Sequence, residues 1–252
     1  MKDEAARFLL ALQFLTRVPT PSEGLYSPQR MATSVRYYPF VGILIGMISA
    51  LVLVAASHVL PATIAVMIAV ASGLLITGGF HEDGLADTFD GIGGGANREH
   101  ALSIMKDSRL GTFGTLALMV VVGLKVAALS TMTTPLAAAS LVAAHGLSRL
   151  SSILVIPTSD YVRDTGTAKP VAKGSSAISL AVALATGAAI VITWAVFGPK
   201  DAVLLGLLGV VVGHVGMRAF FERKLGGYTG DTLGAVQQAS EICFYVAVTA
   251  WL

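Results

Sequence analysis

Three aspartates stand at helical spacing near the middle of the chain. Asp83, Asp87 and Asp90 occupy positions i, i+4 and i+7 within GGFHEDGLADTFDGIGGG, residues 78–95. On a helix these positions share one face, so the carboxylates would repel one another unless a cation lay among them. Mg²⁺ prefers oxygen ligands and is usually held by one or two carboxylates together with substrate phosphates. The spacing therefore predicts a Mg²⁺ site for a phosphorylated substrate, although a solvated, charged helix end would show the same pattern.

The residues around these aspartates offer further chemistry. His81 is a candidate general base or partner of a metal ligand, but a histidine at the end of a span is more often a polar interface residue. Glu82 would project about 100° away from Asp83 on a helix, so it is not expected as a first ligand. Glycines after the aspartates would let backbone N–H groups approach phosphate, but no Walker-type lysine follows, and a flexible link explains them equally well. These glycines are Gly91, Gly93, Gly94 and Gly95.

A second charged segment, IMKDSRLGTFG, covers residues 104–114. It places Lys106, Asp107 and Arg109 immediately before an apolar stretch. Two cations around a carboxylate suit the binding of phosphate beside a metal. Anchoring of the next span in anionic lipid headgroups is the alternative explanation.

Two later polar segments add candidate substrate-binding residues. The segment KLGGYTGDTLGAVQQASE, residues 224–241, contributes Thr229 and Asp231. Asp231 or Thr232 would also serve as the N-cap of the last helix, which is a sufficient structural explanation for either residue. The other segment contributes Arg163, Gly166, Lys169 and Lys173.

The composition indicates what kind of fold must position these residues. Of the 252 residues, 54% are apolar and 13% are charged, whereas an average soluble domain carries roughly 25% charged residues. This balance predicts an all-α, polytopic membrane helix bundle that forms one domain over residues 1–252. A net charge of +2 without a dense basic patch gives no support to nucleic-acid binding. The single cysteine, Cys243, excludes a disulfide framework within one chain.

Apolar segments predict about seven spans, preceded by a short interfacial helix that includes residues 8–15 and is not a cleaved signal peptide. Two spans fall between Tyr37 and Phe80, a stretch without Asp, Glu, Lys or Arg that Pro61 divides. The other five expected spans cover approximately residues 113–131, 136–156, 176–197, 202–220 and 234–252.

The distribution of positive charge predicts the orientation. With the N-terminus inside, Lys200 is the only one of 17 lysines and arginines on an outer connection, and Lys125 and Arg149 lie within spans. The positive-inside rule then places the N-terminus and the polar segments in the cytoplasm, most simply at a bacterial inner membrane. The catalytic segments would be residues 81–112, 157–175 and 221–233.

Several ionisable residues fall inside the expected spans, where such groups are costly and normally face the bundle interior. His145 and Arg149 share one helical face, and Arg149 lies near enough to the inner end to reach the predicted site. The others are Lys125, His214 and Glu241.

At these residues the chain closely resembles the cobalamin synthase family, the adenosylcobinamide-GDP ribazoletransferases. The resemblance runs end to end, although the position of Glu82 is commonly apolar in the family. The matching motifs are LQFLTRVPTP, YYPFVGILIG, GGFHEDGLADTFDG, IMKDSRLGTFG and LGGYTGDTLGA.

The resemblance implies a Mg²⁺-dependent membrane enzyme that joins adenosylcobinamide-GDP to α-ribazole, or its 5′-phosphate, and releases GMP. The three aspartates would then hold one or two Mg²⁺ ions, while Lys106 and Arg109 would stabilise the departing charge. His81 and Asp107 are the two candidate bases.

Two other functions are compatible with parts of the sequence. DGLAD is similar to the signature of CDP-alcohol phosphotransferases, but the usual spacing of that signature is absent. A cation transporter would use the buried charges Lys125, Arg149 and Glu241 instead. The concentration of carboxylates and cations at one face favours an enzyme, and assembly into a homo-oligomer is left open.

Overall fold

The computed structural model describes residues 2–21, 24–163, 169–172 and 176–252. All regular elements in these residues are helices, and one isolated backbone bridge joins Tyr161 to Tyr228. The predicted all-α class is therefore confirmed. In chain order the longer helices are α1 (Lys2–Leu15), α3 (Tyr38–Ser57), α4 (Ala62–Thr77), α5 (Phe80–Gly94), α7 (Thr112–Thr131), α8 (Thr134–Val155), α10 (Ala177–Phe197), α11 (Lys200–Leu225) and α12 (Gly230–Thr249).

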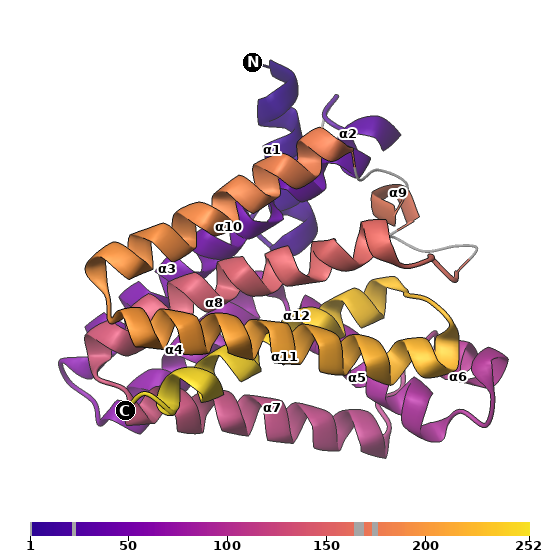
Figure 1. Cartoon of the computed structure of the whole chain (residues 1–252). Helices are drawn as coiled ribbons and strands as arrows, with labels where there is room; N and C mark the ends of the chain where they lie inside the picture. The colour runs from indigo at the N-terminus through magenta and orange to yellow at the C-terminus, as the bar shows by residue number, and fades with distance from the viewer. Residues whose placement is uncertain (1, 22–23, 164–168, 173–175) are drawn as a thin grey trace.

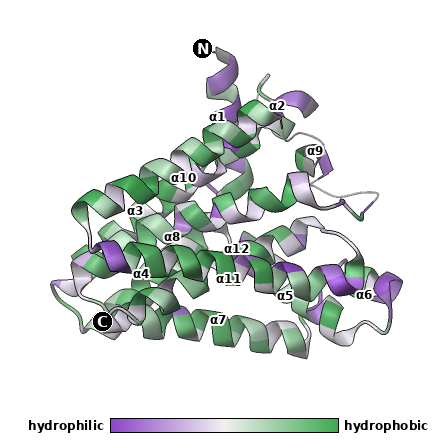
Figure 2. Cartoon of the chain, in the orientation of Figure 1, coloured by the Kyte–Doolittle hydropathy of each residue, from purple (hydrophilic) through white to green (hydrophobic). Residues whose placement is uncertain are grey.

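Most of the longer helices run side by side in one bundle (Figure 1). The shorter helices α2 (Pro28–Ser34), α6 (Arg98–Ile104) and α9 (Lys169–Ala172) gather with α1 at one end of it. Figure 2 shows hydrophilic residues concentrated at this end, whereas the long helices are mostly hydrophobic. The polar segments that the sequence singles out thus lie at a common end of the bundle.

Five segments of the described chain are long and apolar enough to cross a membrane, so this is a multi-pass membrane protein. A sixth candidate is the pair α4 and α5, which passes only if the two helices count as one bent span. The expected C-terminal span forms α12, which is not among the candidates, and the count of seven is not confirmed. Three of the residues buried in α12 are Gln237, Gln238 and Glu241, because this helix packs inside the bundle.

The break between α4 and α5 gives the aspartate helix its direction. Gly78 and Gly79 both have left-handed backbone conformations, with φ values of 69° and 70°. Residues with a Cβ rarely adopt left-handed backbone angles, so glycine is needed at both positions. The two helices meet at 88° across this turn. The apolar pattern predicts that the second of two spans ends near Phe80, and the glycine pair explains why α4 already ends at Thr77.

The N-terminal helix begins at Lys2, earlier than the apolar stretch from Phe8 that predicted it. The buried residues Leu10, Ala11 and Leu15 pack into the core together with Val41 of α3. Glu4 binds the core-facing Arg36, with an Nη1–Oε1 distance of 3.1 Å, and accepts a 2.7 Å hydrogen bond from the Tyr37 hydroxyl. Helix α1 is therefore fixed to the bundle and contributes its last residues to the site described below.

Helices α5 and α12 pack closely at their N-terminal ends because each carries a glycine at the contact. A Cβ added to Gly84 would lie 2.7 Å from the backbone oxygen of Asp231. A Cβ added to Gly234 would lie 3.1 Å from the backbone oxygen of His81. This close approach brings the aspartate helix against the start of the last helix.

Candidate active site

A cavity opens where the first turns of α5 and α12 meet. Asp83 and His81 line it from α5, and Asp231 lines it from α12. Residues of α1, α3, α8 and α9 complete the wall, and the cavity with its mouth contains about 640 Å³ of empty space. We call this space the carboxylate cavity.

Asp231 is held in this cavity by Arg163. The Nη1 atom of Arg163 lies 2.7 Å from Oδ2 of Asp231, and its Nη2 atom donates a 3.1 Å hydrogen bond to the backbone oxygen of Met105. Burial raises the pKa of Asp231, and the charge of Arg163 opposes that rise. Arg163 therefore connects the start of α12 to the segment that follows α6.

Asp87 belongs to the same electrostatic group as Asp83 and Asp231. Its half-buried carboxylate experiences repulsion from Asp231 and Asp83 and attraction from Arg163. Three carboxylates with this one arginine leave an excess of negative charge that a divalent cation would neutralise. Oδ2 of Asp231 is the oxygen that Arg163 contacts at 2.7 Å, so a cation bound here would share this carboxylate with the arginine. These donors fit Mg²⁺ coordination, which needs few carboxylates when substrate phosphates supply the rest.

The carboxylates that the structure brings together as candidate Mg²⁺ ligands differ from the three that the spacing predicts. Across the described residues, no group of three or more His, Cys, Asp or Glu side chains is arranged to hold a metal ion by itself. Asp231 joins Asp83 and Asp87, while Asp90 faces another helix. The predicted role of Asp90 as a ligand is untested, but its neighbours supply a structural role.

Asp90 caps the N-terminus of α7. Its Oδ2 accepts a hydrogen bond from the backbone N–H of Gly111, and its Oδ1 accepts one from that of Gly114, both at 2.8 Å. Gly111 is the N-cap position of α7 and has no side chain that could do this. A negative charge at a helix N-terminus is favourable in addition to the hydrogen bonds.

We therefore expect Asp90→Ala to lower the free energy of unfolding by about 1–2 kcal/mol, the usual cost of losing such a cap. Asp90→Asn, which keeps an oxygen acceptor, should lose less. Thermal unfolding in detergent, measured together with turnover, checks both variants. An Asp90→Asn protein of normal stability whose turnover fell as far as that of Asp83→Asn would instead indicate a metal ligand.

The charged residues after α6 lie apart from the cavity wall. Arg109 is paired with Asp107, with an Nη2–Oδ2 distance of 2.5 Å, and 88% of the Arg109 side chain is exposed. The hydrogen bond from Arg109 lowers the pKa of Asp107, which makes that carboxylate a weaker base. Lys106 is also exposed. Of the two candidate bases, only His81 lines the carboxylate cavity.

The remaining candidates for substrate binding occupy different positions. Thr229 is buried and is the N-cap of α12. Its side-chain oxygen accepts a hydrogen bond from the backbone N–H of Thr232, and the side-chain oxygen of Thr232 accepts one from the backbone N–H of Thr229. The predicted caps Asp231 and Thr232 are therefore wrong, because the helix begins earlier than its apolar pattern indicates. Lys169 begins α9, the short helix that contributes Val171 to the cavity wall. Gly166 and Lys173 lie outside the described residues.

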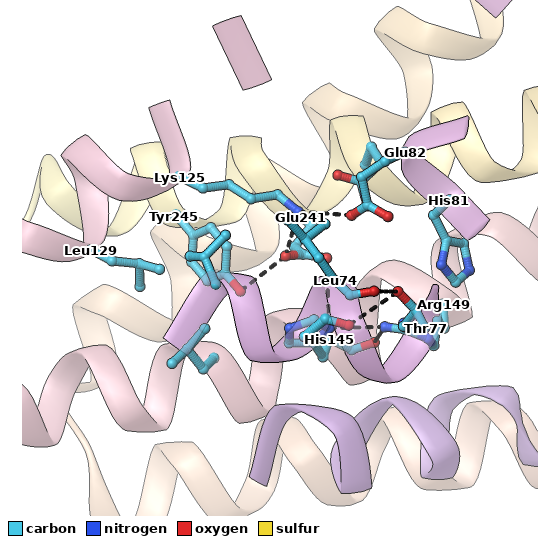
Figure 3. A pocket seen from close by; sticks show the side chains of 14 residues that line it. Leu74, Thr77, His81, Glu82, Lys125, Leu129, His145, Arg149, Glu241 and Tyr245 are labelled. Atoms are coloured by element: carbon cyan, nitrogen blue, oxygen red, sulfur yellow. Dashed lines mark hydrogen bonds and ion pairs between the residues drawn. The ribbon is translucent and has the colours of Figure 1, made fainter. Parts of the chain in front are cut away.

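A second pocket, which shares His81 with the carboxylate cavity, contains a cluster of buried polar groups that sequence reasoning could not pair (Figure 3). The Nζ atom of Lys125 lies 2.9 Å from Oε1 of Glu241 and 3.8 Å from Oε1 of Glu82. The predicted burial of Lys125 and Glu241 is confirmed, since 5% and 2% of their side chains are exposed. We call this group the interior polar cluster; its members are Glu82, Lys125, His145, Arg149, Gln237, Gln238 and Glu241.

Arg149 belongs to the interior polar cluster and does not line the carboxylate cavity. Its Nη1 atom lies 3.1 Å from Nδ1 of His145 and donates a 2.9 Å hydrogen bond to the backbone oxygen of that residue. The expected common face of these two residues is confirmed, whereas the role of Arg149 in substrate binding stays a prediction. His81 lines both the carboxylate cavity and the pocket that contains the interior polar cluster. His214 is only half-buried, 3.0 Å from the hydroxyl of Ser151.

Sequence reasoning missed two kinds of residue. No local pattern in the sequence predicts that Glu82 pairs with Lys125 and Gln238. The polar residues Gln237, Gln238 and Glu241, spaced three and four apart in the otherwise apolar α12, do indicate a buried polar face. Phe14 of α1 and Tyr38 of α3 line the carboxylate cavity. No spacing within one segment could have predicted these two residues, because they come from separate helices.

The fold and the site together define an all-helical, multi-pass membrane protein with a candidate active site of carboxylates and an arginine at one end of the bundle. This arrangement suits transfer chemistry on a phosphorylated substrate. The chain belongs to the cobalamin-5-phosphate synthase family, whose family model matches residues 7–249.

Curated relatives match along nearly their whole length. A protein of Shewanella frigidimarina is 44% identical over 248 residues, which cover 96% of this chain and 94% of the relative. One of Leptothrix cholodnii is 44% identical over 255 residues, covering 99% and 96%, respectively. One of Shewanella baltica is 41% identical over 246 residues, covering 95% and 92%. All three are named adenosylcobinamide-GDP ribazoletransferase. No solved structure matches the chain.

Proposed function

We propose that this chain is an adenosylcobinamide-GDP ribazoletransferase, a transferase of cobalamin synthesis. Family membership over residues 7–249 is the observation that carries this proposal. In the reaction a ribose hydroxyl of α-ribazole, or of its 5′-phosphate, attacks the phosphorus attached to cobinamide. A new P–O bond forms, the bond from that phosphorus to the bridging oxygen of the diphosphate breaks, and GMP leaves with that oxygen. The products are adenosylcobalamin, or its 5′-phosphate, and GMP.

The chain's own residues supply alignment and charge. Asp83, Asp87 and Asp231 would hold Mg²⁺, which when bound neutralises the diphosphate and so favours attack by the hydroxyl. His81 accepts the proton of the attacking hydroxyl, because among the two candidate bases it is the one on the cavity wall. Arg163 orients Asp231 through their 2.7 Å contact.

Lys106 and Arg109 would reach the departing phosphate from the edge of the site. Met105, which accepts the hydrogen bond from Arg163, immediately precedes Lys106. Both cations are exposed, so they are accessible to a large polar substrate that arrives from water. Lys169 would assist from α9.

The active site faces the cytoplasm of a bacterial inner membrane in this proposal. The positive-inside rule supports this orientation, because the polar end of the bundle carries nearly all the lysines and arginines. Polar substrates would then reach the carboxylate cavity from the cytoplasm without crossing the bilayer.

The test uses the full chain purified in detergent with adenosylcobinamide-GDP, α-ribazole and Mg²⁺. We expect GMP and cobalamin in equal amounts, loss of both on addition of EDTA, and recovery with excess Mg²⁺. Turnover that persisted in EDTA would refute the metal dependence. No product from demonstrably folded protein, together with turnover of a CDP-activated substrate and a membrane alcohol, would refute the proposed reaction.

A further inference from the structure

The carboxylate cavity also carries aromatic rings from three separate helices. Phe14, Tyr38 and Phe80 all line it, from α1, α3 and α5 respectively. The rings of Phe14 and Tyr38 are stacked, with centroids 5.8 Å apart and planes at 17°. Phe80 meets Phe14 edge to face at 5.2 Å, and its ring also lies 5.2 Å from that of His81. The candidate base and the carboxylates therefore share one cavity with an aromatic group.

The rest of this wall is mainly apolar. It includes Leu15, Ile153, Ile156 and Leu233. The Tyr38 hydroxyl is buried beside Ser34, so Tyr38 contributes its ring to the cavity wall.

The proposed function supplies two planar bases that differ in polarity. Guanine, in the leaving GMP, presents several donors and acceptors that would need partners in a buried site. The base of α-ribazole is a benzimidazole with two methyl groups and one free ring nitrogen. An apolar wall rejects a base whose polar groups it leaves unpaired, whereas aromatic rings accept the face of either base. The wall therefore matches the benzimidazole.

We propose that the aromatic and apolar part of the carboxylate cavity binds the benzimidazole base of α-ribazole, and that the ribose then lies toward Asp83 and Asp231. This inference rests on the proposed function and assigns one substrate to one subsite. Phe14 and Phe80 contact the base from the cavity wall. Holding the base in this way brings the ribose hydroxyl to the carboxylates and to His81, which supplies the alignment on which phosphoryl-type transfer depends.

The test measures equilibrium binding of α-ribazole and, separately, of GMP to the detergent-purified full chain. Stacking on an aromatic ring contributes about 1–3 kcal/mol per base. Phe80→Ala should therefore raise the Kd of α-ribazole by roughly tenfold and leave the Kd of GMP within about twofold. Phe80→Trp should keep the wild-type affinity. Because Phe80 is 39% exposed, its replacement leaves the core intact, and Phe14→Leu provides a second variant.

Phe89→Ala is the matched control. Phe89 is on the same helix, pairs with Phe220 at 5.0 Å, and is absent from the cavity wall. Its replacement should change neither Kd. An unchanged α-ribazole affinity in both Phe80→Ala and Phe14→Leu would overturn the inference, as would a selective loss of GMP binding. If wild-type protein made product while these variants bound α-ribazole normally, the inference would fail and the proposed function would stand.

Discussion

Replacing Asp83 by asparagine is expected to lower turnover by roughly 10²–10³-fold, with the amount of folded protein unchanged. Asparagine has nearly the same size, so the variant removes charge without opening a space. The side chain is exposed and lines the carboxylate cavity, so its loss leaves no buried group unpaired. The effect should fall on the reaction, because loss of one group that stabilises transition-state charge typically costs this much. GMP release by purified protein under saturating substrates is the measurement.

Asp201→Asn is the matched control for this variant. Asp201 is exposed in the first turn of α11 and lies outside the carboxylate cavity. The same change of charge there should leave turnover near the wild-type value. If Asp83→Asn retained near-normal turnover at unchanged protein levels, Asp83 would not be a metal ligand. A comparable fall in both variants would point to a general effect of charge.

Lys125→Met is expected to be the most destabilising single substitution among those considered. It would leave Glu241, with only 2% of its side chain exposed, without the cation that lies 2.9 Å away. Removing one partner of a buried pair typically costs about 3–5 kcal/mol, because the other charge stays buried and unpaired. For a chain of this length that loss lowers Tm by on the order of 10 °C. Thermal unfolding in detergent measures it.

The double variant Lys125→Met/Glu241→Gln tests the reason for this loss. With neither charge present, no unpaired ion is left at the Lys125–Glu241 contact. Glu82 loses the cation 3.8 Å away but still accepts its 2.8 Å hydrogen bond from Gln238. We therefore expect the double variant to be more stable than Lys125→Met alone. If the double variant lost as much stability as Lys125→Met and Glu241→Gln lose in sum, the pairing of Lys125 with Glu241 would not be the source of the instability.

Local patterns along the chain predict the class of the fold and most of the helices. The long apolar segments became α3, α7, α8, α10, α11 and α12 with ends within a few residues of expectation. Hydropathy and helix-breaking residues such as Pro61 are local properties, so they can be read along the chain. The Asp83 motif was also local, because helical spacing alone places its carboxylates near one another. Even so, the hydropathy pattern does not reveal the Gly78–Gly79 turn, which ends α4 and sets α5 at 88° to it.

Which of the predicted groups meet depends on contacts between helices that are far apart in the chain. Asp231 approaches the α5 aspartates because Gly84 and Gly234 let two helices from distant parts of the chain pack closely. Asp90 was predicted from its spacing as a ligand, but the position of α7 beside α5 gave it two backbone N–H groups to cap. Phe14 entered the cavity wall by a similar long-range contact. Spacing along one helix predicts which side chains share a face, whereas the groups that this face meets depend on how the helices pack.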